Sequence, residues 1–66
     1  MTQPEQQFRV DDRVQLIRTF AGVAVGTYGT IVTRFTLQSL YDVRFDGHTT
    51  PRIVEARYLA PAPPEP

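Results

Sequence analysis

Two stretches of this chain decide its fold: Gly26-Thr27-Tyr28-Gly29-Thr30-Ile31-Val32 and Tyr41-Asp42-Val43-Arg44-Phe45-Asp46-Gly47. The first holds two glycines three positions apart, followed by a β-branched run. Glycine adopts a positive φ without steric cost, so this pair predicts a sharp turn that leads into a strand. The second alternates apolar and polar residues and ends at Asp-Gly, a turn dipeptide. Together they predict two neighbouring antiparallel strands of a very small barrel.

The residues on either side of these stretches predict the remaining strands. Val14 and Leu16 share one face while the residue between them points the other way, which is the period of a half-buried strand. The segment 20–29 contains three glycines but is too apolar for a linker, so it predicts a long ordered loop that packs Val23 or Val25 inward. No stretch has a helical period, which favours an all-β fold. The further expected elements are strands at 30–35, 40–45 and about 50–54, connections at 36–39 and 46–48, a single 3₁₀ turn at 56–58, and Leu59 closing the barrel.

The chain has 66 residues, close to the lower limit for a domain that folds alone. Residues 1–7 are polar and the tail 61–66 is rich in proline, so both ends are expected to be disordered around an ordered barrel at 8–60. The candidate core residues are Val10, Val14, Leu16, Phe20, Val23, Val25, Ile31, Phe35, Tyr41, Val43, Phe45, Ile53, Val54 and Leu59. Because this core is small, self-association or docking on a partner is expected.

The composition narrows the classes of function. Seven arginines balance seven acidic residues, so no overall field draws the chain to nucleic acid or to anionic lipid. The absence of cysteine rules out disulfides, thiolate metal sites and a cysteine nucleophile. No apolar run approaches the roughly 18 residues of a membrane span. The first residues lack the basic flank and apolar core of a signal peptide, so we expect a cytoplasmic protein.

Four motifs resemble those of the small stand-alone bacterial SH3-like proteins, most of which are uncharacterised. They are Asp12-Arg13-Val14-Gln15-Leu16, the two stretches quoted above, and Ala56-Arg57-Tyr58-Leu59. In that family a D-x-V-x-L strand is followed by G-T-x-G-T-V-V, by Y-x-V-x-F and by a closing A-x-x-L. The resemblance spans about residues 8–60. It implies an all-β, five-stranded SH3-like barrel with a short 3₁₀ turn before the last strand.

Two looser resemblances concern the role of the protein. The hairpin from Arg34 to Phe45 is similar to a G-T-F-L-Q-x-x-x-Y-x-V-x-F run of small nitrogen-fixation accessory proteins. SH3-like subunits that attach to photosynthetic electron-transfer complexes share the barrel. Both resemblances are to accessory proteins. The small core, the zero net charge, the lack of a catalytic constellation and the loop aromatics lead us to expect a non-catalytic protein-interaction module, an accessory subunit that docks on a larger bacterial complex.

Three aromatic residues are the candidate protein-binding surface: Phe20, Tyr28 and Tyr58. They lie in the long loop and the 3₁₀ turn, the segments that flank the peptide groove of SH3 domains, and protein interfaces are enriched in such residues. The chain has no tryptophan, so binding of proline-rich peptides in the usual SH3 manner is not expected. The simpler interpretation is that Tyr28 and Tyr58 only cap the barrel.

Four arginines form the alternative candidate, a nucleic-acid-binding face made of Arg18, Arg34, Arg44 and Arg52. If Ile31 and Phe35 face the core, Arg34 is outward and close to Arg44 on the neighbouring strand. Such a face would contact phosphate groups. The simpler interpretation is that Asp42 and Asp46 neutralise these arginines and the face is only solvated.

No catalytic, metal or cofactor site is predicted. His48 is the single histidine and Ser39 the single serine, and neither has the partners that a metal site or a nucleophile needs. Asp11 and Asp12 are adjacent, so on a strand they would point to opposite faces. A small oligomeric enzyme is the least favoured function. Plasmid-type dihydrofolate reductases are SH3-like barrels with a Val-Gln-Ile-Tyr strand, whereas the corresponding region here reads Arg-Ile-Val-Glu at 52–55.

Overall fold

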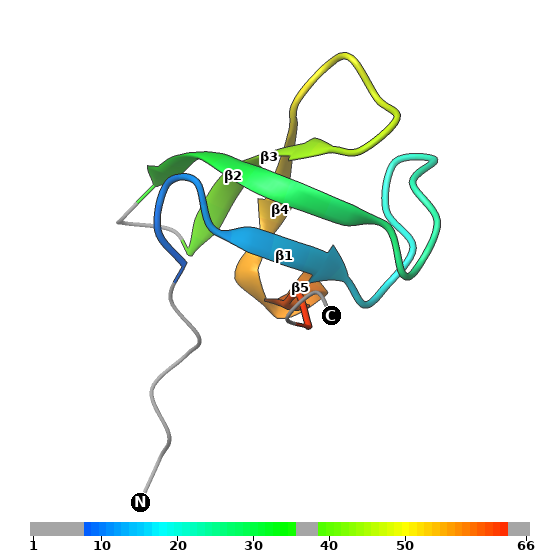
Figure 1. Cartoon of the computed structure of the whole chain (residues 1–66), viewed down its shortest axis with the longest axis horizontal. Coiled ribbons are helices and arrows are strands. Elements are labelled where there is room, and N and C mark those ends of the chain that lie inside the picture. The colour runs from blue at the N-terminus through cyan, green and yellow to red at the C-terminus, as the bar shows by residue number, and fades with distance from the viewer. Residues whose placement is uncertain (1–7, 36–38, 64–66) are drawn as a thin grey trace, which may run out of the picture.

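The computed structural model describes residues 8–35 and 39–63, and within them the chain forms five strands and one 3₁₀ turn (Figure 1). The elements in chain order are β1 (Arg13–Leu16), β2 (Tyr28–Phe35), β3 (Leu40–Phe45), β4 (Arg52–Glu55), the 3₁₀ turn η1 (Ala56–Tyr58) and β5 (Leu59–Pro61). The predicted fold class is therefore confirmed: the protein is all-β, with a single 3₁₀ turn directly before its last strand. None of the described residues belongs to a helix long and apolar enough to cross a membrane.

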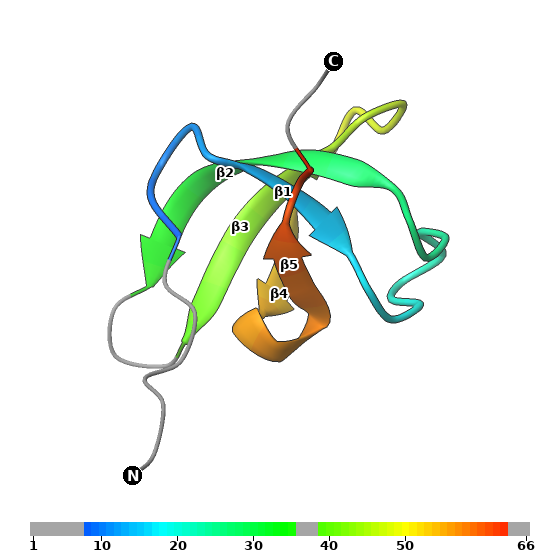
Figure 2. The same ribbon diagram turned by 60° about the horizontal axis from the view of Figure 1, so that its bottom comes forward.

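All five strands join one antiparallel sheet in the order β4-β3-β2-β1-β5. Strand β1 pairs with β2 on one side and with β5 on the other, so the first and last strands lie side by side (Figure 2). The turn η1 carries the chain from β4, at one edge, to β5, at the opposite edge. This crossover curls the sheet around a single core.

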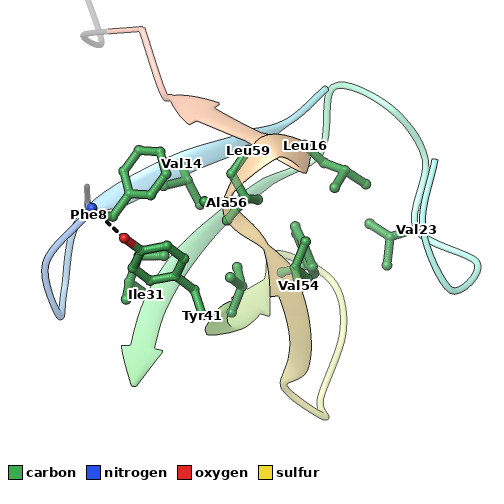
Figure 3. Packing of buried hydrophobic residues seen from close by; sticks show 11 residues of the cluster. Phe8, Val14, Leu16, Val23, Ile31, Tyr41, Val54, Ala56 and Leu59 are labelled. Carbon is green, nitrogen blue, oxygen red and sulfur yellow. Dashed lines mark hydrogen bonds between the residues drawn. The ribbon is translucent and has the colours of Figure 1, made fainter. Parts of the chain in front are cut away.

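The core is a cluster of buried apolar side chains from every strand and from the segments at both ends of the sheet (Figure 3). Its members are Phe8, Val14, Leu16, Val23, Ile31, Tyr41, Val43, Phe45, Val54, Ala56 and Leu59. Phe8 and Ala56 are additions to the predicted core. Phe8 lies edge-on to Tyr41 at 5.3 Å between ring centroids, and its backbone N–H donates to the Tyr41 hydroxyl at 3.1 Å. The residues just before β1 thus close one end of the core.

Four predicted core residues are exposed instead: Val10, Val25, Phe35 and Ile53. Phe20 is only partly buried. In the long loop it is Val23, not Val25, that packs inward. In β4 only Val54 of the neighbouring pair at 53 and 54 reaches the core, because adjacent residues of a strand point to opposite faces.

A β-bulge at Val32 explains the exposed end of β2. The register runs from Ile31 opposite Val43 directly to Thr33 opposite Asp42, so Val32 is an extra residue on β2. One extra residue inverts the alternation of side chains beyond it. The simple alternation that placed Phe35 inside is therefore wrong beyond the bulge.

The two glycines of the fold-deciding stretch have different roles. Gly26 has a φ of +93°, as a sharp turn requires, whereas Gly29 has no positive φ and lies within β2. A Cβ at Gly29 would lie 2.7 Å from Val43 Cγ1 and 3.1 Å from the backbone oxygen of Arg44. The prediction of a turn conformation thus holds for Gly26 and is wrong for Gly29, which is required for close strand packing.

The ends of the chain fall mostly outside the described residues, namely 1–7 and 64–66. Of the tail predicted to be disordered at 61–66, the first part is ordered, because Pro61 belongs to β5 opposite Val14. The N–H of Ala62 then donates to the backbone oxygen of Arg13 at 3.1 Å.

Candidate functional site

Phe20 and Tyr58, two of the three predicted binding aromatics, are brought into contact. Their rings meet edge to face, with centroids 5.6 Å apart and an interplanar angle of 80°. Phe20 is held by a two-way backbone pairing with Val23, whose side chain is fully buried. Tyr58 is held by η1, and its backbone oxygen accepts a hydrogen bond from the N–H of Ile17 at 2.8 Å. Backbone pairing therefore anchors the main chain at both residues, and packing against the core and against each other positions the rings.

The ring pair carries a charged group on its outer side. The Arg57 guanidinium lies 5.5 Å from the centroid of the Tyr58 ring, and its Nε is 2.6 Å from a carboxylate oxygen of Glu55. We call Phe20, Arg57 and Tyr58 the aromatic patch. Phe20 and Tyr58 are packed against the core yet only partly buried, so each ring presents one side to the core and another to solvent. Such an arrangement offers a partner apolar ring surface, a hydroxyl and the exposed ion pair of Arg57 and Glu55.

Tyr28 is not part of this arrangement. It begins β2 opposite Gln15, and the buried neighbours of Gln15 on β1, Val14 and Leu16, show that Gln15 and Tyr28 are on the outer face of the sheet. Tyr28 is 37% exposed, and neither ring pair among the described residues includes it. The structure thus joins two of the three predicted aromatics and separates the third.

The four arginines of the alternative candidate do not gather on one face. Arg34 lies opposite the core residue Tyr41, whereas Arg44 lies opposite Thr30 on the outer face, because the bulge inverts the side-chain alternation between them. Arg18 follows β1 and Arg52 begins β4. The expected proximity of Arg34 and Arg44 is therefore wrong. None of these four arginines belongs to either of the two ion pairs among the described residues.

Arg13 makes the ionic contact that the sequence analysis missed. Its guanidinium donates to both carboxylate oxygens of Asp46, at 3.0 and 2.6 Å, and to the Thr30 hydroxyl at 2.9 Å. The hydrogen bonds from Arg13 to Asp46 lower the pKa of the Asp46 carboxyl, partial burial raises it, and the charge of Arg13 lowers it further. Asp46 is thus neutralised by Arg13 and not by Arg44 as the sequence suggested. The outward position of Arg13 could be predicted from the alternation along β1. The strand order that brings Arg13 to Asp46 could not be predicted from the sequence.

A hollow of about 490 Å³ lies on the outer face next to this ion pair. We call it the outer hollow. Its floor is the segment 30–32 of β2, with the bulge residue Val32. One wall is formed by Val10 and Asp11, and the opposite wall by the segment 44–48, which contains Arg44 and His48. No signal in the sequence pointed to it, because its floor and the spacing of its walls depend on the bulge and on residues just before β1.

The other residues considered as candidates, Asp11, Asp12 and Ser39, have structural roles. Asp11 has a left-handed backbone with a φ of 75°, and Asp12 accepts a hydrogen bond from the N–H of Arg9 at 2.9 Å, so together they shape the turn before β1. The backbone oxygen of Ser39 accepts a hydrogen bond from the N–H of Ala56 at 2.9 Å. Within residues 8–35 and 39–63, histidine, aspartate and glutamate side chains do not come together in groups of three or more that would hold a metal ion.

Comparisons with known proteins identify no family for this chain. No protein-family description, no curated protein and no solved structure matches it significantly. The function proposed below therefore rests on the geometry of the chain itself.

Proposed function

We propose that this protein is a non-catalytic interaction module, an accessory subunit that docks on a larger protein complex through the aromatic patch. The observation that carries the proposal is the edge-to-face pair of Phe20 and Tyr58 with Arg57 beside it. Aromatic and arginine side chains supply most of the binding energy at protein interfaces, above all where they are rigid before binding. We also propose a cytoplasmic location and no bound cofactor.

The rigidity of the patch supports this function. The backbone hydrogen bond from Ile17 to Tyr58 and the pairing of Phe20 with Val23 anchor the main chain at both residues, and the two rings pack against the core and against each other. When a partner covers them, these positioned rings lose little side-chain entropy, so each buried ring contributes more to affinity. Ile17, whose backbone N–H bonds to the Tyr58 oxygen, is a further exposed apolar residue at 45% exposure.

Nucleic-acid binding through Arg18, Arg34, Arg44 and Arg52 is the alternative. A phosphate backbone is bound tightly where several arginines line one face. Here the bulge separates Arg34 from Arg44, and the net charge of the chain is zero. We therefore rank this function second, and the experiment below separates the two.

The test is affinity capture of partners from the native cell with the full-length chain as bait. We expect Tyr58→Ala to reduce recovery of the partner that the unmodified chain captures, whereas Tyr28→Ala, which lies outside the aromatic patch, should not. Arg34→Gln, a substitution of an exposed arginine away from the patch, should leave recovery unchanged. Circular dichroism of each variant must show the strand content of the unmodified chain.

Two outcomes would contradict the proposal. One is partner recovery that is insensitive to Tyr58→Ala in a folded variant. The other is capture of nucleic acid that disappears as the salt is raised to about 200 mM, as phosphate contacts require. Because Tyr58 is partly buried, Arg57→Ala serves as the second variant, since it removes the cation without opening the core.

A further inference from the structure

The outer hollow is a concave site on the face of the sheet, separate from the aromatic patch. Its volume of about 490 Å³ is in the range of sites that take a small ligand or the end of a peptide. Strand β2 forms its floor. On one side, the N–H of Asp11 donates to the Ile31 oxygen at 2.8 Å. On the other side, Arg44 lies opposite Thr30 in the ladder between β2 and β3. The walls are thus attached to the floor by backbone pairing on both sides.

Two aliphatic side chains at the hollow are exposed. Val10 is 54% exposed on one wall and Val32 is 41% exposed on the floor. The bulge at Val32 inserts this residue into β2, next to the segment that pairs with Asp11. Apolar surface inside a concavity loses its contact with water when a ligand enters, so Val10 and Val32 favour an occupant with an aliphatic group.

One wall of the hollow offers a binding group for a negatively charged occupant, because Arg44 is the arginine that lines it. Asp46 is bound through both carboxylate oxygens by Arg13, so its charge is compensated. Arg44 belongs to neither ion pair among the described residues, and His48 lies on the same wall. Two carboxylates also line the hollow, Asp46, which Arg13 binds, and Asp11 on the far wall, which belongs to neither ion pair among the described residues. A guanidinium binds a carboxylate through two parallel hydrogen bonds, which gives orientation as well as affinity.

We propose that the outer hollow binds the carboxyl terminus of a partner chain that ends in an aliphatic residue. The terminal carboxylate accepts hydrogen bonds from the Arg44 guanidinium, and the aliphatic side chain lies between Val10 and Val32. A chain terminus fits because its carboxylate and its last side chain branch from the same carbon. Arg44, Val10 and Val32 line the same hollow, so one occupant can contact all three. This site does not rest on the aromatic patch, and either one can fail without the other.

The probe is the dipeptide N-acetyl-Gly-Val, titrated into the full isotope-labelled chain and followed by amide NMR shifts. We expect saturable shifts at residues 30–32 and 44–48 with the free acid, and binding at least about tenfold weaker with the C-terminal amide, because the amide removes the charge that Arg44 recognises. Equal binding of acid and amide, or no shift at these residues, would overturn the proposal. Acetate alone binding as tightly as the dipeptide would also overturn it, because the aliphatic group would then contribute nothing.

Three substitutions locate the site. Arg44→Gln should weaken binding of the free acid about tenfold, whereas Arg34→Gln, which changes an arginine beyond the bulge, should have no effect. Asp11→Asn removes the opposing charge while keeping a residue type that tolerates a left-handed backbone, so it should tighten binding severalfold. Binding that responds equally to Arg44→Gln and Arg34→Gln would show only a nonspecific charge effect and would contradict the site. Weaker binding in Asp11→Asn would contradict the assigned role of Asp11.

Discussion

Gly29 shows how a single residue limits this fold, because the backbone and side chains of β3 occupy the space where its Cβ would be. Any side chain there must displace Val43, Phe45 or the backbone at Arg44. Gly47 is the opposite case: its φ of +85° strains any other residue, but the space around it is open. The two glycines are thus required for different physical reasons, one by packing and one by backbone conformation.

We expect Gly29→Ala to lower the free energy of unfolding by about 1–3 kcal/mol, the usual cost of overpacking. Gly47→Ala should cost about 1 kcal/mol through backbone strain alone. Urea denaturation followed by circular dichroism measures both. In a Val43→Ala background the penalty at Gly29 should fall, because the closest atom is removed, while the penalty at Gly47 should not change. Strictly additive effects at Gly29 and Val43 would contradict the packing argument.

The ion pair of Arg13 and Asp46 predicts a pH dependence of stability. Because Arg13 holds the pKa of Asp46 below its ordinary value of 3.8, the pair stabilises the fold above about pH 4 and loses this effect as the pH falls through the folded-state pKa. Both side chains are largely exposed, so the contribution at neutral pH is below about 1 kcal/mol.

We expect Asp46→Asn to reduce the unfolding free energy slightly at pH 7 and to match the unmodified protein at strongly acid pH, as measured by denaturant titration across the acid range. The control is Asp42→Asn, because Asp42 lies in the same part of the chain and belongs to neither ion pair among the described residues. Its stability difference from the unmodified protein should not disappear at acid pH. If the stability difference between Asp46→Asn and the unmodified protein grew toward acid pH, the predicted direction of the pH dependence would be wrong.

At the scale of elements, the segment before β1 belongs to the core although it is not a strand. Phe8 is buried against Tyr41, while Val10, two residues later, is exposed. We expect Phe8→Ala to cost about 3–5 kcal/mol, enough to threaten folding of so small a domain, and Val10→Ala to cost less than about 0.5 kcal/mol. Thermal melts of the two variants give the comparison. Similar melting temperatures for both would mean that the segment does not close the core.

The sequence was sufficient to predict the strands but not their faces beyond a bulge. Alternation along β1 and β3 correctly predicted Val14, Leu16 and Val43 as core residues, because both strands keep an unbroken pleat. Alternation along β2 predicted Ile31 correctly and Phe35 wrongly, since nothing local indicates that Val32 is an extra residue.

Prediction from the sequence is also limited where two neighbouring residues are both apolar and where contacts join residues far apart in the chain. At 53 and 54 both residues are apolar, and the choice between them depends on which face the curled sheet turns inward. The sequence predicted that Phe20 and Tyr58 lie in the long loop and the 3₁₀ turn, but it did not predict the contact between their rings. The contact of Arg13 with Asp46 spans 33 residues and requires β1 and β3 to flank β2, which only the strand order reveals.

At the scale of the whole molecule, the charges are balanced and dispersed. The net charge is zero, and the bulge places Arg34 and Arg44 on opposite faces. We therefore expect no measurable binding of double-stranded DNA or RNA in fluorescence anisotropy at about 50 mM salt, and no change at about 200 mM. Tight binding at low salt that weakens steeply with added salt would favour the nucleic-acid function instead.

The pairing of the first strand with the last has a mechanical consequence. Because β1 and β5 are antiparallel neighbours, the start of β1 at Arg13 and the end of β5 at Pro61 lie at the same end of their ladder. A pulling force applied through the two ends of the chain would load the hydrogen bonds between these strands one after another, as in opening a zipper, and not all at once as in shear. The barrel should therefore yield at low force when it is tethered by its ends. Attached through one end only, it experiences no such load.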